Sequence, residues 1–158
     1  MSDLPVYRAT LEAEWIDYNG HLRDAYYGLV ASYAVDAVMD QLGIDAAYRE
    51  ATRCTLYTLE MHLHYLHEVK FSDALEVRST VLDFDAKRIH LGCLFACDRV
   101  DGAVATAEMM LMHVHQGEKP ASARLPESMQ ARLAELKLLA AAREPFAPGS
   151  RKIELKRR

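Results

Sequence analysis

Residues 15–42 read WIDYNGHLRDAYYGLVASYAVDAVMDQL, a short polar loop followed at once by a long amphipathic segment. From Arg23 to Leu42 the apolar side chains recur at the three- and four-residue spacing of one buried helix stripe. Gly43 follows as a typical helix stop. At ~1.5 Å per residue such a helix is about 30 Å long, enough to lie along a whole sheet. We therefore expect a helix over 23–42 whose apolar stripe a sheet covers.

The rest of the chain is predicted to be mainly β-strand. Apolar residues dominate or alternate with polar ones over 6–15, 56–67, 74–84, 87–99 and 103–115. Asp101-Gly102 between the last two runs is a typical hairpin turn. The order is strand, long helix and then four antiparallel strands joined by short turns. It predicts an α+β fold in which one antiparallel sheet wraps around the helix.

The chain is predicted to divide into a main domain and a C-terminal addition. Residues 1–116 hold the strands and the long helix, and 117–158 follow them. Pro126 and the apolar spacing over 126–142 predict a second helix. From Arg143 the chain ends in a basic tail, which we expect to be poorly ordered.

Composition excludes several classes of protein. A net charge of −4 and a pI of about 6.0 give the chain no bias towards nucleic acid. No apolar run approaches the ~20 residues that span a bilayer, and the N-terminus lacks the pattern of a signal peptide. Cys54, Cys93 and Cys97 are an odd number of cysteines without a CxxC pair, so we expect reduced thiols. We expect a cytoplasmic protein with no nucleic-acid or membrane partner.

The loop places one carboxylate, Asp17, just ahead of the predicted helix. A helix N-terminus offers unpaired N–H groups and partial positive charge. A carboxylate beside such donors can act as a nucleophile or general base while the donors stabilise an oxyanion. These are the parts that hydrolysis of an acyl ester or thioester needs. The alternative is that Asp17 caps the helix, although helix propensity resumes only some five residues later.

Aromatic residues are frequent around this loop. Their rings could hold a quaternary ammonium by cation–π attraction, or they could pack between the first strand and the helix. The five candidates are Trp15, Tyr18, Tyr26, Tyr27 and Tyr57.

Two polar residues of the loop have both a functional and a structural interpretation. His21 could orient the substrate or donate to the thioester, or it could serve the turn that Gly20 makes. Asn19 could contact the substrate, but a turn is its more common role. The histidine pairs His62/His64 and His113/His115 alternate on strands, and no Cys or carboxylate spacing accompanies them, so we expect no metal.

The order of elements resembles the hotdog fold, and the residues strengthen the resemblance. Asp17-x-x-Gly20, followed by Asp24 and Tyr27, is similar to the loop and helix start of the 4-hydroxybenzoyl-CoA-type acyl-CoA thioesterases. The runs FSDALEV (71–77) and DFDAKRIH (83–90) resemble the same family. Within it, WIDYNGH resembles the betainyl-CoA thioesterase branch, which is associated with carnitine breakdown.

The resemblance implies an acyl-CoA thioesterase without a metal or redox cofactor, since CoA arrives as part of the substrate. Asp17 would be the nucleophile or general base, and the backbone N–H near Asp24 would polarise the carbonyl. Asp24 departs from the family, whose members often carry Asn, His or Tyr near this point. Its charge would raise the pKa of one carboxylate, or its side chain would point to solvent. The family also implies a homodimer or homotetramer joined through sheet edges, with active sites shared between subunits.

Lys87 and Arg88 follow the turn at Asp85-Ala86 and could contact CoA phosphates, or they could be ordinary solvated charges.

Two other functions remain open, because a fold does not fix a chemistry. One is a hotdog hydratase, whose His–acid pair His21 and Asp24 could imitate. The other is a non-catalytic protein that binds an acyl-CoA or a quaternary amine.

Overall fold

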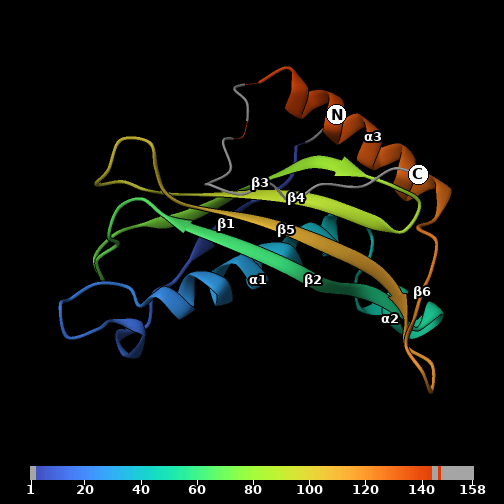
Figure 1. Cartoon of the computed structure of the whole chain (residues 1–158), viewed down its shortest axis with the longest axis horizontal. Coiled ribbons are helices and arrows are strands. Elements are labelled where there is room, and N and C mark those ends of the chain that lie inside the picture. The colour runs from blue at the N-terminus through green and yellow to red at the C-terminus, as the bar shows by residue number, and fades with distance from the viewer. Residues whose placement is uncertain (1–2, 144–145, 147–158) are drawn as a thin grey trace.

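A computed structural model describes residues 3–143 and Phe146 of the 158-residue chain. One antiparallel sheet has the strand order β1-β3-β4-β5-β2, with the short β6 beside β5 (Figure 1). The strands are β1 (Val6–Ala9), β2 (Cys54–Tyr65), β3 (Leu75–Phe84), β4 (Arg88–Cys97), β5 (Ala103–His115) and β6 (Ala121–Ser122).

The central helix α1 (Asp24–Gln41) lies against one face of this sheet (Figure 1). Its ends lie within one residue of the predicted 23–42. Tyr27 of α1 packs against Phe95 of β4, with ring centroids 5.8 Å apart. Burying a side chain such as Phe95 contributes about 1.5–3 kcal/mol. The facing residues of β4 are all buried, as the alternation predicted, namely Ile89, Leu91, Cys93, Phe95 and Cys97.

Two shorter helices complete the fold. α2 (Ala46–Thr52) follows α1 and is capped by the Asp45 side chain, which accepts the Tyr48 N–H at 2.8 Å. α3 (Glu127–Ala141) packs beside β3 and buries Met129, Leu133 and Leu136, which confirms the second helix. Apart from Arg143 and Phe146, the basic tail lies outside the described residues.

The predicted first strand, 6–15, is too long. β1 ends at Ala9, and the chain then forms a 3-10 helix, η1 (Ala13–Trp15). The reason is the register, because Ala9 pairs with Leu75, the first residue of β3. Beyond that pair, β3 offers residues 10–15 no strand to join.

The predicted succession of strands also needs a correction. β2 and β3 follow each other in sequence but do not pair, because β2 lies at the far edge beside β5. A bulge between Thr58 and Glu60 interrupts its alternation. Tyr57, Leu59 and Tyr65, expected on one half-buried face, keep 37%, 55% and 47% of their surface exposed. Residues 66–74 connect β2 to β3 and therefore pass across β5 and β4, which lie between these two strands in the sheet.

The three cysteines are free and buried, as predicted. Burial raises the pKa of the Cys93 thiol to about 11, so that thiol stays protonated. None of the helices in the described ranges is long and apolar enough to cross a bilayer.

Candidate active site

The loop between η1 and α1 is closed by its own backbone. The Asp17 N–H donates to the His21 carbonyl at 2.8 Å, and the Gly20 N–H donates to the Asp17 carbonyl at 3.0 Å. Gly20 has a φ of +80°, which glycine adopts without strain. Asp17 Oδ1 accepts the N–H groups of Asn19 and His21 at 2.8 and 3.0 Å. The turn therefore fixes the position of the Asp17 carboxylate.

The same hydrogen bonds keep Asp17 ionised. The His21 N–H bond is the leading cause that lowers the pKa of Asp17 below its usual value, and the Asn19 N–H and the charge of Arg23 act in the same direction. Desolvation opposes them. Oδ2 makes no hydrogen bond to any of the residues that the structure describes. An ionised oxygen is therefore available to a substrate or to water.

The loop is tied to the segment that connects β2 to β3. The Leu22 N–H donates to the Val69 carbonyl at 2.7 Å, and His21 forms an isolated antiparallel bridge with Lys70. On the other side, the Arg23 N–H donates to the Trp15 carbonyl at 3.0 Å. The loop is thus held from both flanks.

An ion pair between the buried Asp73 and the exposed Arg99 holds the connecting segment in turn. Asp73 Oδ2 accepts the Lys70 N–H at 2.9 Å, and Arg99 donates to both Asp73 oxygens at 3.1–3.2 Å. Arg99 also donates to the Glu68 carbonyl at 2.6 Å. Asp73 is 7% exposed, so its carboxylate supports the segment from inside the fold while Arg99 reaches it from the surface.

Asp17 does not cap α1. Arg23 occupies the N-cap position, and no side chain caps the helix there. Asp24 Oδ1 accepts the Ala25 N–H at 2.9 Å, and the Tyr26 N–H donates to the Arg23 carbonyl at 3.1 Å. The Asp24 N–H makes no hydrogen bond within the described part of the chain. It is therefore a donor for developing negative charge at a helix N-terminus.

Asp24 does not act on Asp17 as a like charge. Its exposed side chain turns back to its own helix, and it is not among the groups that shift the pKa of Asp17. We expected Asp24 either to raise the pKa of a carboxylate or to point to solvent, and in the structure its side chain is exposed to solvent.

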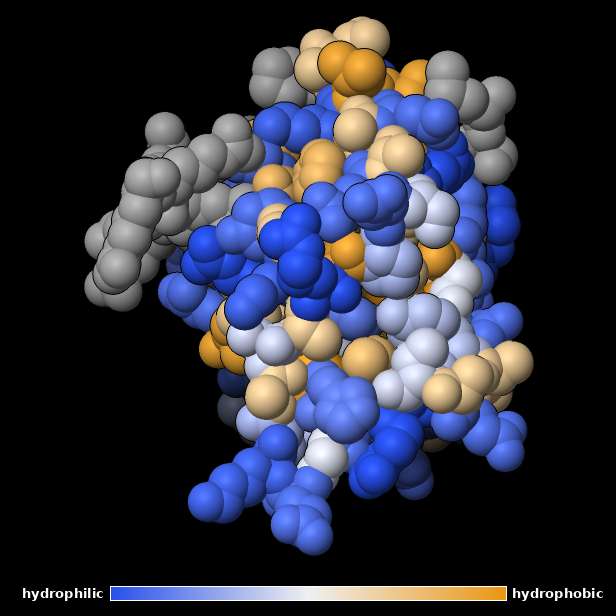
Figure 2. Space-filling model, turned by 90° about the vertical axis from the view of Figure 1, so that its right-hand side faces the viewer, coloured by the Kyte–Doolittle hydropathy of each residue, from blue (hydrophilic) through white to orange (hydrophobic). Residues whose placement is uncertain are grey.

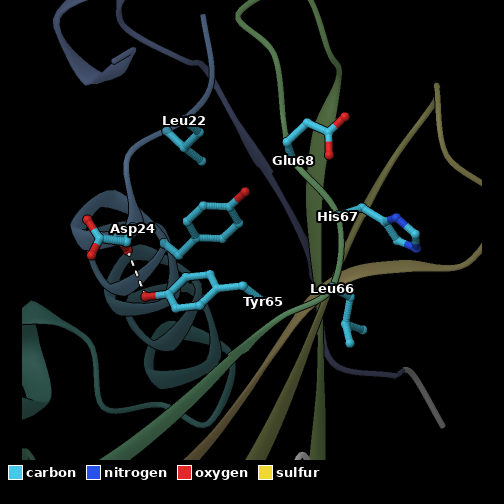
Figure 3. A pocket seen from close by; sticks show the side chains of 7 residues that line it. Leu22, Asp24, Tyr65, Leu66, His67 and Glu68 are labelled. Atoms are coloured by element: carbon cyan, nitrogen blue, oxygen red, sulfur yellow. Dashed lines mark hydrogen bonds between the residues drawn. The ribbon is translucent and has the colours of Figure 1, made fainter. Parts of the chain in front are cut away.

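An open cavity of about 330 Å³ adjoins the start of α1 (Figure 3). Tyr27 and Tyr65 meet edge to face in its wall, with ring centroids 5.2 Å apart and an angle of 82° between the planes. The Tyr65 hydroxyl donates to the Asp24 carbonyl at 3.1 Å. The lining residues are Leu22, Asp24, Tyr27, Tyr65, Leu66, His67 and Glu68.

The structure brings most of the predicted site residues to this end of α1. Trp15 and Tyr26 stack on each other at 5.2 Å, and Tyr18 is 94% exposed at the tip of the loop. No hydrogen bond or ion pair joins His21 to Asp24 among the described residues, so the pair that a hydratase would need is not formed. No three metal-ligating side chains group together anywhere in the described ranges.

Tyr57, Lys87 and Arg88 lie at the other end of the sheet. Tyr57 is eight residues before Tyr65 on β2, roughly 25 Å along the strand. Arg88 and Tyr57 both pair with Met112 of β5. The Lys87 ammonium donates to the Ser122 hydroxyl at 3.0 Å, and the Arg88 Nε donates to Asp85 at 2.9 Å.

Sequence reasoning missed Tyr65 and Glu68. Tyr65 lies within the strand predicted over 56–67 and Glu68 directly follows it, but nothing in that pattern indicates that the chain returns to the Asp17 loop. The hydrogen bond from Leu22 to Val69 and the bridge between His21 and Lys70 bring them there.

A curled antiparallel sheet around one helix, with an ionised carboxylate beside the helix N-terminus, defines a hotdog-fold thioester hydrolase. Residues 11–133 match the family model of the thioesterase-like superfamily, and the chain belongs to that superfamily. The predicted fold and the predicted activity class are thereby confirmed.

The similar curated proteins carry more specific names than the superfamily. The chain is 47% identical over 111 residues to the betainyl-CoA thioesterase of Pseudomonas aeruginosa, which is 70% of each chain. It is 38% identical over 129 residues to the L-carnitine dehydrogenase/betainyl-CoA thioesterase of Agrobacterium fabrum. That match covers 81% of this chain, but this chain spans about a quarter of that relative's length (26%).

Solved structures agree over nearly the whole chain. A candidate thioesterase from Pseudomonas putida KT2440 is 38% identical, with a TM-score of 0.80 and coverage of 99% of both chains. A Staphylococcus aureus protein solved in complex with CoA is 29% identical, with a TM-score of 0.82 and coverage of 96% and 94%.

Proposed function

We propose that this protein hydrolyses betainyl-CoA to betaine and CoA, with Asp17 as the catalytic carboxylate and the Asp24 N–H as the oxyanion donor. One observation carries the proposal. An ionised carboxylate is held in a closed loop beside a helix whose first N–H is free to donate. The 47% identity to a betainyl-CoA thioesterase supports the substrate.

The chemistry follows from these two groups. Asp17 Oδ2 attacks the thioester carbon and forms a mixed anhydride that water hydrolyses, or Asp17 removes a proton from a water molecule that attacks instead. On either route the carbonyl oxygen gains negative charge, which the Asp24 N–H and the positive end of α1 stabilise. The C–S bond then breaks. CoA leaves as the thiolate, which takes up a proton. CoA is part of the substrate, and these steps involve no metal or redox cofactor.

We also propose that the protein is a homodimer or homotetramer joined through β2. This strand lies at an edge of the sheet, and within the described residues no strand neighbours its outer backbone groups. Tyr57, Leu59 and Tyr65 leave apolar surface exposed along it. An exposed apolar edge strand is a site for pairing with another chain. Light scattering after gel filtration would measure the oligomer, and a monomer would contradict the proposal. The cytoplasmic location stays a prediction.

The direct test of the function is free-thiol release from a panel of acyl-CoAs. The panel contains betainyl-CoA, acetyl-CoA and longer straight chains, and we expect turnover to favour betainyl-CoA. Turnover that favours aliphatic chains would keep the mechanism and reject the substrate. Saturable binding without thiol release would support a binding protein, and hydration of an enoyl-CoA would support a hydratase; either would overturn the proposal.

A further inference from the structure

We infer that the cavity between the start of α1 and the end of β2 binds the trimethylammonium group of the substrate, with Tyr65 supplying aromatic surface and Glu68 the opposite charge. The inference rests on the proposed betainyl-CoA substrate. It names the residues that distinguish this cationic acyl group from a neutral one of the same shape.

The covalent structure of the acyl group decides where such a site must lie. In a betainyl thioester a single methylene joins the ammonium nitrogen to the carbonyl carbon. The cation therefore has to bind directly beside the oxyanion donor. Asp24 meets this requirement, because its N–H is the proposed donor and the residue is one of those that line the cavity. The Tyr65–Asp24 hydrogen bond at 3.1 Å fixes the Tyr65 ring at the same place.

The lining has the chemistry that a quaternary ammonium needs. Such a group has no N–H to donate, so aromatic rings and carboxylates attract it without hydrogen bonds. Tyr65 lines the cavity with 47% of its surface exposed, and its ring meets the buried Tyr27 ring at 82°. Asp24 and Glu68 are also lining residues and carry negative charge, with carboxylates that point away from the Tyr65 ring (Figure 3). A backbone hydrogen bond at Glu68, with the charges of His21, Arg99 and Lys70, lowers the pKa of Glu68, so its side chain is anionic at neutral pH.

The other aromatic candidates do not reach this cavity. Trp15 and Tyr26 cover a face of each other by stacking, and Tyr18 extends into solvent. Tyr57 lies at the opposite end of β2. Of the five aromatic residues expected around the site, Tyr27 alone is among the lining residues, and Tyr65 takes the place of the others.

The test compares two substrates that differ only in charge. 3,3-Dimethylbutyryl-CoA replaces the trimethylammonium nitrogen of betainyl-CoA by carbon and keeps its shape. The measured quantity is the ratio of the kcat/KM values for the two substrates. We expect the wild-type protein to favour betainyl-CoA, and we expect Glu68→Gln and Tyr65→Leu each to reduce the ratio roughly fivefold, with little change for the neutral substrate.

Matched variants separate the effects of the Glu68 charge and the Tyr65 ring from other effects of the substitutions. Tyr65→Phe keeps the ring without the hydroxyl and should retain most of the ratio. Glu118→Gln, in the exposed loop before β6, and Tyr33→Leu, on an exposed part of α1, make the same chemical changes away from the cavity and should leave it unaltered. If Tyr65→Leu does not fold, Glu68→Gln decides alone, since its side chain is exposed.

The two proposals fail differently. A wild-type preference for betainyl-CoA that survives both Glu68→Gln and Tyr65→Leu would overturn the cation site and leave the proposed function standing. A wild-type protein that hydrolyses the neutral substrate but not betainyl-CoA would overturn the proposed substrate and the cation site with it.

Discussion

The two ends of the sheet use their polar residues differently. At the far end, around α2 and β6, the groups pair among themselves. The Tyr48 hydroxyl bonds His113 Nε2 at 3.0 Å, and His113 Nδ1 bonds the Ala123 carbonyl at 3.2 Å. Lys87 bonds Ser122. The surface at this end is mainly hydrophilic, with small separate apolar patches (Figure 2).

At the start of α1 the pairing is incomplete. Asp17 Oδ2 and the Asp24 N–H keep their hydrogen-bonding capacity, beside an open cavity. Buried polar groups in folded proteins are normally satisfied. The candidate site therefore differs from a structural polar cluster in one respect. Some of its polar groups can still bind a ligand after the hydrogen bonds of the local fold have formed.

Among changes that test the difference between the two ends of the sheet, we expect the largest effect from Asp17→Asn. Asparagine keeps the size and the oxygen that accepts the Asn19 and His21 N–H groups, but it removes the charge. We expect kcat/KM to fall by roughly 10²-fold or more, with only a small fall in the melting temperature from losing the stabilisation linked to Asp17 ionisation. Asp45→Asn is the control, because Asp45 also accepts a backbone N–H, at the start of α2, and should retain full activity. Wild-type turnover in Asp17→Asn would reject the role of the carboxylate.

Asp73→Asn should cost both stability and activity. It weakens the pair with Arg99 that holds the segment to which the Asp17 loop is bonded. We expect a loss of about 2 kcal/mol in the free energy of unfolding, since Arg99 is partly exposed, and a fall in kcat of roughly tenfold from a displaced loop. Denaturant unfolding and kinetics on the same sample measure both. A loss of stability with unchanged kcat would show that the segment does not position the loop.

Tyr48→Phe should cost stability alone. It removes the hydroxyl from His113 at the far end, and the loss is about 1 kcal/mol. Burial lowers the pKa of His113, so the ring is neutral at pH 7 and accepts the Tyr48 proton at Nε2 while Nδ1 donates to Ala123. Thermal unfolding measures the loss, and kcat/KM should be unchanged. A fall in kcat/KM would mean that the two ends are coupled.

The smallest effect is expected from mild acid. The pKa of Asp17 is lower than its unfolded value of about 3.9, so the active, ionised form persists as pH falls from 7 to 5. The stabilisation linked to this ionisation is present above the unfolded pKa and is lost as pH falls through the folded pKa. We expect kcat/KM to be flat above pH 5 and to decline only below about pH 4. An acid limb with a midpoint above 5 would show that a neighbouring negative charge acts on Asp17.

Local pattern predicted the elements well. The bounds of β5 are those predicted, 103–115, because both a hairpin turn and a loop glycine delimit it. α1 and α3 each lie within one residue of their predicted ends, since a long helical stripe is repeated many times. The pairing of β2 with β5 could not be predicted, because alternation indicates which face is buried but not which strand lies alongside.

The site divides in the same way. Asp17, His21 and Asp24 could be named because they are neighbours in sequence and the turn that joins them is local. Glu68 could not, since the connection from the edge strand β2 to β3, which are not neighbours in the sheet, carries it to the loop. Lys87 and Arg88 have suitable chemistry for CoA, but composition and spacing contain no information on their distance from Asp17.

The burial of all three native cysteines has a practical consequence. A thiol-reactive dye would find no accessible partner among Cys54, Cys93 and Cys97. Tyr18 is 94% exposed at the tip of the Asp17 loop, and its side chain contributes no hydrogen bond to the turn. Tyr18→Cys would therefore give a single labelling position next to the carboxylate, from which fluorescence could report substrate arrival in real time.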